Sequence, residues 1–184
     1  MTGNQVKEFN KKNTYIGVSK KSYGRTYFAS RDFKKGEVIM VGFGKIIDHQ
    51  TPHISVQIGI NKHYLPNIWT GRFWNHACKS NTYMKTRADG FPSLVVLKAI
   101  KQGEEITYSY WMSELRWTKY ADESKIKCKC GSRNCKGKIL SFSQLSKIEQ
   151  GKIIHKKMCS KYLMNLHVLM PMVLNNKVAI SLVK

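Results

Sequence analysis

Short apolar segments separated by turn residues constrain the fold of this chain more than any other feature. Five strand candidates of this kind lie at residues 14–18, 26–29, 38–41, 92–99 and 104–110. A sixth, residues 54–60, alternates isoleucine or valine with small and polar residues, which is the period of a half-buried strand. Turn sequences such as Lys34-Lys-Gly-Glu37 separate them. We therefore expect a β-dominated α+β fold built from many short strands.

The pattern changes beyond Trp111. Residues 113–120 are expected to form a short helix, and from residue 142 onward apolar residues follow helical spacing until Pro171 ends the helix. These apolar positions are Leu145, Ile148, Ile153 or Ile154, Met158 and Tyr162. We predict a basic, solvated arm at residues 1–13, a main domain at 14–111, a cysteine segment at 124–140 and a helical tail at 141–184.

The charge of the chain points to acidic partners. Lys and Arg total 32 against 11 Asp and Glu, a formal net charge of +21, which attracts polyanions such as nucleic acid. A hydrophobic content of 42% with 11% aromatic residues excludes general disorder. We see neither an apolar run of about 20 residues that would span a membrane nor an apolar secretory signal, and expect a soluble protein.

Three of the five cysteines fall within Cys128-Lys-Cys130-Gly-Ser-Arg-Asn-Cys135. This spacing suits thiolates that converge on one metal ion better than a disulfide framework. Zinc prefers four ligands, and the fourth would come from Cys78, Cys159 or a histidine. A reducing compartment, cytosol or nucleus, is expected for such thiols.

Two further stretches carry chemistry. The first is Arg72-Phe-Trp-Asn-His-Ala-Cys-Lys-Ser-Asn81, whose polar groups are costly to bury without partners. The second is Gly103-Glu-Glu-Ile-Thr-Tyr-Ser-Tyr110, where strand alternation would place Tyr108 and Tyr110 on one face. Taken alone, the first also fits a polar loop with a hydrogen-bonded histidine, and the second fits two core tyrosines.

Together and in this order, these stretches resemble the SET-domain protein-lysine methyltransferases over residues 15–140. Gly24-Arg-Thr-Tyr-Phe-Ala29, followed by Asp32-Phe-Lys-Lys-Gly-Glu37, is similar to the opening Gly-x-Gly-x-x-Ala motif and its turn. The stretches ending at Asn81 and Tyr110 are similar to the two central signatures, and the cysteine segment is similar to a post-SET zinc segment. The compact chain resembles the short microbial and viral members.

Several residues depart from the family pattern. Thr26 stands at the second glycine of the opening motif, Ala77 replaces serine, Ser80 replaces proline and Ser109 replaces aspartate. The tyrosine often found near residues 41–44 is missing. Thr26 puts the details of the cofactor loop in question.

The resemblance implies a fold of small curved β-sheets with a pseudoknot, where the segments carrying Asn75 and Tyr110 cross, a post-SET zinc segment and a short helical C-terminal tail. It implies that Tyr110 is the catalytic tyrosine, assisted by Tyr108. It assigns S-adenosylmethionine binding to Tyr23, Gly24, Arg25, Asn75, His76 and Tyr110. It assigns zinc to Cys78, Cys128, Cys130 and Cys135, and leaves Cys159 as a buried structural thiol.

The function implied is that of an S-adenosylmethionine-dependent protein-lysine N-methyltransferase with a mono- or dimethyl product. The expected partner is a nucleosomal histone or another DNA-associated protein, with non-specific DNA contact through the basic surface. The expected location is the nucleus or cytoplasm, or the host nucleus for a viral or bacterial protein. The alternatives are a basic zinc-containing nucleic-acid-binding module and an inactive SET domain that binds peptides.

Overall fold

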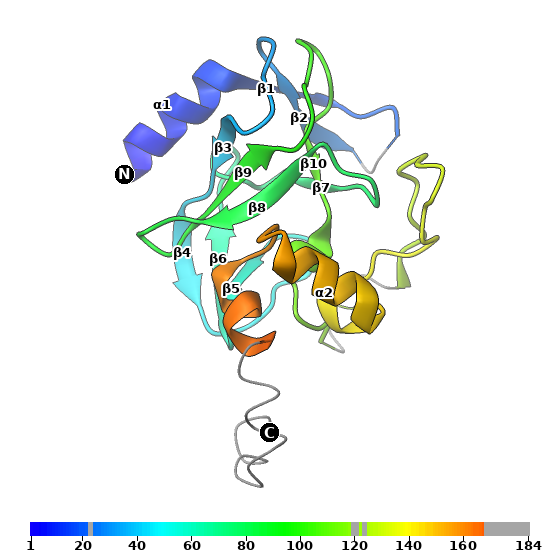
Figure 1. The fold of residues 1–184 in the computed structure, drawn as a ribbon. Helices are drawn as coiled ribbons and strands as arrows, with labels where there is room; N and C mark the ends of the chain where they lie inside the picture. Colours follow the sequence, from blue (N-terminus) through cyan, green and yellow to red (C-terminus); the bar gives the residue numbers. More distant parts are fainter. Residues whose placement is uncertain (22–23, 119–121, 123–124, 168–184) are drawn as a thin grey trace, which may run out of the picture.

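The computed structural model describes residues 1–21, 24–118, 122 and 125–167 (Figure 1). Three small antiparallel sheets hold most of its strands. The first pairs β1 (Thr14–Val18) with β2 (Arg25–Ala29). The second has the order β3 (Val38–Val41), β9 (Pro92–Val96), β8 (Thr82–Thr86), and the third the order β4 (Gly44–Ile47), β6 (Lys62–Pro66), β5 (Val56–Gly59). The predicted β-dominated fold of short strands is confirmed.

A fourth sheet consists of two short parallel strands, β7 (Asn75–His76) and β10 (Thr107–Tyr108). These strands come from the two central motifs. Two parallel strands need a long connection between them, and here β8 and β9 form part of the connection from β7 to β10. This pairing places the two motif segments side by side.

The alternating segment at residues 54–60 forms a shorter strand than its pattern predicts. β5 ends at Gly59, and Ile60 and Asn61 form the turn to β6, with Asn61 at φ 47°. Asparagine tolerates this left-handed conformation better than most residues. Ile60 therefore points into solvent with 58% of its surface exposed, although the alternation suggested a buried position.

The N-terminal residues form helix α1 (Gly3–Asn13), so the predicted solvated arm at 1–13 is wrong. A capping box between Thr2 and Gln5 starts the helix, and Val6 packs into the core. The buried Asn10 side chain donates to the carbonyls of Val41 and Trp69 and accepts the Val41 N–H at 2.9 Å. Polar composition concealed the helix because its main anchor is an amide rather than an apolar side chain.

Between residues 142 and 167 the C-terminal region is mostly helical, but not as one helix. After the 3₁₀ turn η3 (Phe142–Gln144), α2 (Lys147–His155) begins with a capping box at Ser146 and Glu149. The chain breaks near Lys157, at φ 52°, before residues 161–167 form a further helix. Ile148, predicted to face inward, is 71% exposed, and Pro171 lies outside the described residues.

The predicted helix at 113–120 is also displaced. A 3₁₀ turn, η1 (Tyr110–Met112), precedes it, residues 113–118 are not helical, and residues 119 and 120 lie outside the described part. The core between these elements is aromatic and aliphatic, with Tyr27, Ile39, Tyr64, Met84 and Leu94 fully buried. Among the residues described, no helix is long and apolar enough to cross a membrane.

Candidate active site

The two central motif segments are joined by the side chain of Asn81. Its Nδ2 donates to the Glu105 carbonyl at 2.8 Å, and its Oδ1 accepts the Thr107 N–H at 2.9 Å. The Ala77 N–H donates to the Tyr108 carbonyl at 3.2 Å, which extends the parallel pairing. These hydrogen bonds hold the segments that carry Asn75 and Tyr110 side by side.

A cavity of about 460 Å³ opens beside this junction. Its walls come from β7 and the loop before it, from β10 and η1, from Arg25 on β2, and from the cysteine segment. Side chains separated widely in the sequence therefore face one space, which is the usual form of a small-molecule site.

Tyr108 and Tyr110 both line this cavity, with ring centroids 5.1 Å apart. The prediction placed the two tyrosines on one face of a strand. They do not share a strand, because β10 ends at Tyr108 and Tyr110 begins η1. The Tyr110 hydroxyl donates to the Trp74 carbonyl at 2.9 Å. Burial holds the pKa of Tyr108 well above its usual range, so its phenol stays protonated.

Asn75 and His76 also line the cavity, and His76 connects it to the cysteines. The Asn75 side chain donates to the Arg25 carbonyl at 3.0 Å. The Tyr110 backbone N–H donates to His76 Nδ1 at 3.1 Å, so the imidazole proton belongs on Nε2, which lies 3.4 Å from the Cys78 sulfur. Burial lowers the pKa of His76 to about 4, which keeps the ring neutral.

The opening motif is represented in the cavity by Arg25, which lies over the Phe73 ring at 5.9 Å. Gly24, at φ +85°, is not among the residues that line the cavity, and Tyr23 lies outside the described residues. Thr26 is fully buried on β2 and does not line the cavity, so it does not narrow it. Its hydroxyl has no hydrogen-bond partner within the described structure.

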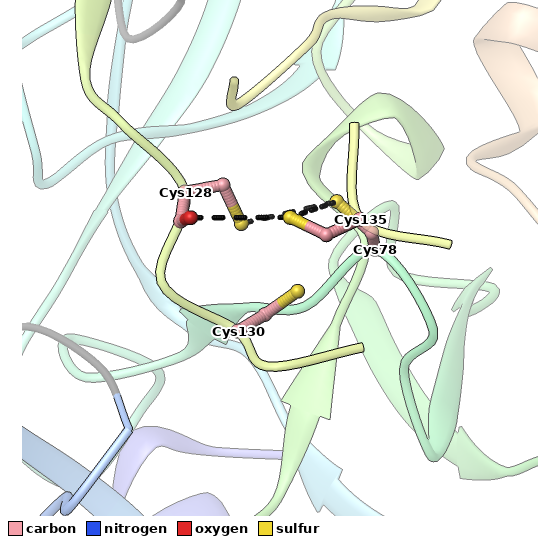
Figure 2. Close-up of side chains that lie close together, drawn as sticks. All are labelled: Cys78, Cys128, Cys130 and Cys135. Carbon is pink, nitrogen blue, oxygen red and sulfur yellow. Dashed lines mark hydrogen bonds between the residues drawn. The ribbon is translucent and has the colours of Figure 1, made fainter. Parts of the chain in front are cut away.

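Four cysteines gather beside the cavity. The sulfurs of Cys78, Cys128, Cys130 and Cys135 all lie within 4.8 Å of one another and point toward a common centre (Figure 2). The Cys78 sulfur is 3.8 Å from that of Cys128 and 4.0 Å from that of Cys135. A tetrahedral zinc site with bonds of about 2.3 Å has sulfur–sulfur edges of about 3.8 Å, so the donor set fits zinc. The group includes Cys78 and excludes Cys159, which is fully buried elsewhere.

The thiols differ in how readily they form the thiolates that a metal ion binds. Burial raises the pKa of Cys78 to about 11 and raises that of Cys128 further. Burial acts in the same direction at Cys130, but contacts with Ser132 and backbone groups outweigh it and hold the pKa at about 6. Backbone N–H groups of Lys136 and Gly137 donate to the sulfurs of Cys78 and Cys135, each at 3.4 Å. A divalent metal would supply the remaining charge that four thiolates need.

Sequence reasoning missed several residues of the site. Trp117 lines the cavity, and its indole N–H donates to the Ile139 carbonyl at 3.0 Å, which ties the cysteine segment to the wall. The loop from Gln50 to Val56 and the buried Glu114 also line it. The only available signal for Glu114 was an acid in the stretch Trp111-Met-Ser-Glu-Leu-Arg-Trp117, in a chain with 11 acids. Nothing in the sequence marked the loop.

Comparison with known proteins finds a family match for the part of the chain that carries both central motifs. Residues 24–111 match the SET domain family. Histone-lysine N-methyltransferase trithorax of Drosophila virilis is 29% identical over 142 residues, covering 66% of this chain and 4% of the relative. Histone-lysine N-methyltransferase set-2 of Caenorhabditis elegans is 38% identical over 69 residues, covering 36% of this chain and 4% of the relative.

Two further proteins are similar to this chain. The human histone-lysine N-methyltransferase, H3 lysine-36 specific, is 27% identical over 126 residues, covering 58% of this chain and 4% of the relative. A crystal structure of a Plasmodium falciparum protein described as a histone methyltransferase aligns with a TM-score of 0.45 and 24% identity, over 53% of this chain and 92% of that chain. The chain spans about 4% of the length of these three curated relatives. The family match covers both central motifs and the strands that carry them, so residues 24–111 of this chain are similar to the SET domain family.

Proposed function

We propose that this chain is an S-adenosylmethionine-dependent protein-lysine N-methyltransferase. The observation that supports this most strongly is the convergence of Tyr108, Tyr110, Asn75, His76 and the cysteine segment on one cavity. The names of the relatives, all histone-lysine N-methyltransferases, support the same activity.

The cofactor would be held between β2 and β7. Arg25 offers a guanidinium to a carboxylate, and the Asn75–His76 backbone borders the same space. S-adenosylmethionine, when bound, supplies a methyl group on a positively charged sulfur, which is a good leaving group. Tyr23 and Gly24 remain predicted contributors from the opening motif.

The target lysine must lose its proton before it attacks, because its unperturbed pKa is about 10.4. Trp74, Tyr108 and Tyr110 make the wall aromatic, and an apolar wall disfavours the ammonium form. The Tyr110 hydroxyl is held by its bond to the Trp74 carbonyl, so its oxygen would meet the reacting groups without having to reorganise. Such a preorganised dipole supports the charge that develops on the attacking amine.

Zinc on the four cysteines would fasten the segment at 124–140 over the domain at 14–111. Cys128, Lys129 and Cys130 line the cavity, so this segment forms part of its wall. Losing the metal would open the lysine channel and leave the sheets intact.

Tyr108 is proposed to limit the product to mono- or dimethyllysine. Its hydroxyl occupies space that a growing methylammonium group would need. We predict that Tyr108→Phe advances the product by at least one methyl group, measured by intact mass spectrometry of a peptide at long reaction times. Abundant trimethyllysine from the unmutated enzyme would contradict this assignment.

The proposed substrate is a histone or another DNA-associated protein, in the nucleus or on chromatin. A net charge of +21 repels a free basic tail but favours a nucleosome, whose phosphates dominate the field. Six Lys and Arg residues, with no acid among them, lie between positions 125 and 138 of the cysteine segment and favour direct DNA contact.

The experiment compares transfer of labelled methyl from S-adenosylmethionine to nucleosomes, free histones and a cell lysate. A methyltransferase labels a lysine in at least one of them. Calorimetry with S-adenosylmethionine separates the enzyme from a nucleic-acid-binding module, which does not bind it. The transfer of labelled methyl separates the enzyme from an inactive SET domain, which binds its peptide without transferring methyl.

A further inference from the structure

The wall behind Tyr108 contains a buried carboxylate that the proposed reaction does not use. Glu114 is 3% exposed. Its carboxylate accepts hydrogen bonds from the Gln57 backbone N–H at 2.9 Å, the Gln50 side-chain amide at 2.9 Å and the Ser113 hydroxyl at 3.1 Å. Several converging donors are what an ionised carboxylate needs inside a protein, and an ionised carboxylate can only accept.

The hydroxyl proton of Ser113 has a defined direction. The serine is fully buried, and its oxygen lies 3.1 Å from Glu114 Oε1, 3.3 Å from the Tyr110 carbonyl oxygen and 3.4 Å from the Tyr108 hydroxyl. The Tyr110 carbonyl already accepts two backbone N–H groups, from Ser113 at 3.0 Å and Glu114 at 2.9 Å. The single Ser113 proton therefore goes to the Glu114 carboxylate, and the serine oxygen is left to accept.

This arrangement fixes the Tyr108 hydroxyl in turn. Because both other neighbours of the Ser113 oxygen only accept, the contact between the two hydroxyls is made by the Tyr108 proton. The phenol is protonated, so it has one proton to give and two lone pairs to offer. With its proton directed to Ser113, Tyr108 presents only lone pairs to the cavity that its ring lines.

We infer that Ser113 and Glu114 are positioning residues that orient the Tyr108 hydroxyl, so that it accepts a hydrogen bond from the target amine. This inference rests on the proposed function. A neutral amine that donates an N–H to Tyr108 keeps its lone pair free to attack the methyl group. A hydroxyl turned the other way would donate to that lone pair and block the attack.

A double-mutant cycle tests whether Ser113 orients the Tyr108 hydroxyl. Ser113→Ala should lower kcat for the first methyl group by about fivefold, the size of one lost hydrogen bond, with KM for the peptide unchanged. In a Tyr108→Phe background the same change should have no effect on kcat, because no hydroxyl remains to be oriented. Ser113→Thr retains the hydroxyl and should keep the wild-type kcat. If Ser113→Ala impairs folding, Ser113→Cys takes its place, because its side chain has nearly the same volume as serine but is a poorer hydrogen-bond acceptor. Ser113→Cys should then show the loss in kcat expected for Ser113→Ala.

Ser141→Ala is the matched control, because Ser141 is also fully buried but bonds to Gln144 instead. It should change kcat equally in both backgrounds. An equal loss for Ser113→Ala in both backgrounds, or none in the wild type, would overturn the inference and leave Ser113 a structural residue.

A second readout does not depend on activity. In protein labelled at tyrosine, the Tyr108 hydroxyl proton should exchange slowly with water and show a nuclear Overhauser contact to the Ser113 β-protons, and both signals should disappear in Ser113→Ala. Fast exchange of the Tyr108 hydroxyl proton in the wild-type protein would refute the inference that Tyr108 donates to Ser113. If the wild-type enzyme transfers no methyl group, the proposed function fails, while this spectrum still decides how Tyr108 is oriented.

Discussion

At the scale of single residues, two substituted motif positions lie in contact beneath the candidate site. Ser80 and Ser109, which stand where the family pattern has proline and aspartate, are both buried, with their hydroxyl oxygens 3.1 Å apart. Each hydroxyl oxygen also lies within hydrogen-bond distance of a backbone carbonyl, Ser80 of Thr82 at 2.9 Å and Ser109 of Ala77 at 2.8 Å, so two hydroxyl protons serve three contacts. Ala77, the third departure, thus contributes only its backbone. The contact suggests that the two serines compensate for each other.

Replacing either serine should therefore depend on the other. We predict that Ser80→Ala and Ser109→Ala each lower the free energy of unfolding by about 1–3 kcal/mol, because each leaves a buried polar group without its partner. The double variant should lose less than the sum of the two. Urea unfolding of the four proteins measures this, and strictly additive losses would show that the serines act independently.

At the scale of elements, the cysteine segment is connected to the SET domain through Cys78. This residue follows β7, whereas the other three cysteines lie 50 or more positions later in the chain. The segment has little regular structure of its own, with one bridge between Lys127 and Lys138 and a bond from the Cys128 N–H to the Gly137 carbonyl at 3.0 Å. A metal would therefore supply most of the stability of this element.

We predict one zinc ion per chain, and a loss of most of it in Cys78→Ser, because three thiolates cannot complete the tetrahedral site. Cys159→Ser should retain the metal, since the Cys159 thiol lies outside the cluster. Elemental analysis of the purified proteins measures both. Chelation of the wild-type protein should reduce its activity by a larger fraction than it reduces its secondary structure, measured by far-ultraviolet circular dichroism. Full zinc content in Cys78→Ser would assign the fourth ligand elsewhere.

The elements differ in how well their sequences predict them. β1, β2 and β3 lie within one residue of their expected positions because their apolar segments are bounded by clear turn residues. Helix α1 was not predicted, because its buried contact is made by the polar Asn10. The break near Lys157 was not predicted either, since the apolar spacing continues across it. Local sequence patterns do not reveal contacts between residues that are far apart in the sequence and meet only in the folded protein.

The candidate site was also predicted only where its residues form a local sequence pattern or match the family motifs. The cysteine cluster was expected because three of its ligands are close in sequence, and Cys78 was named only through the family resemblance. Glu114 carries no such pattern, because its partners Gln50 and Gln57 lie 64 and 57 positions away. Its role in the wall is visible only from the hydrogen bonds.

At the scale of the whole molecule, stability should depend on pH through buried histidine. His63 on β6 is buried, its Nδ1 has no hydrogen-bond partner in the described part of the chain, and burial together with the charge of His49 lowers its pKa to about 4. The unfolded chain binds this proton near pH 6.5, and the folded protein does so only near pH 4. Stability from the neutral ring is therefore complete above about pH 6.5 and is lost as the pH falls toward 4.

We predict that His63→Phe weakens this dependence. The free energy of unfolding of the wild-type protein should fall more steeply between pH 6.5 and 4 than that of the variant, and the difference between them should be constant above pH 6.5. Chemical unfolding at a series of pH values measures both curves. Parallel curves across this range would show that His63 is not responsible.

The central claim is that this molecule transfers a methyl group in the cavity where Tyr110 lies. The most direct measurement is single-turnover transfer of labelled methyl from S-adenosylmethionine to nucleosomes, by the wild-type protein and by Tyr110→Phe, with calorimetric affinity for S-adenosylmethionine measured on both. Our account predicts that the wild type labels a histone lysine, and that Tyr110→Phe loses about a hundredfold or more in rate while its affinity stays within about twofold, because the hydroxyl acts in the transition state. Equal rates for the two proteins would contradict the account and remove Tyr110 from the mechanism.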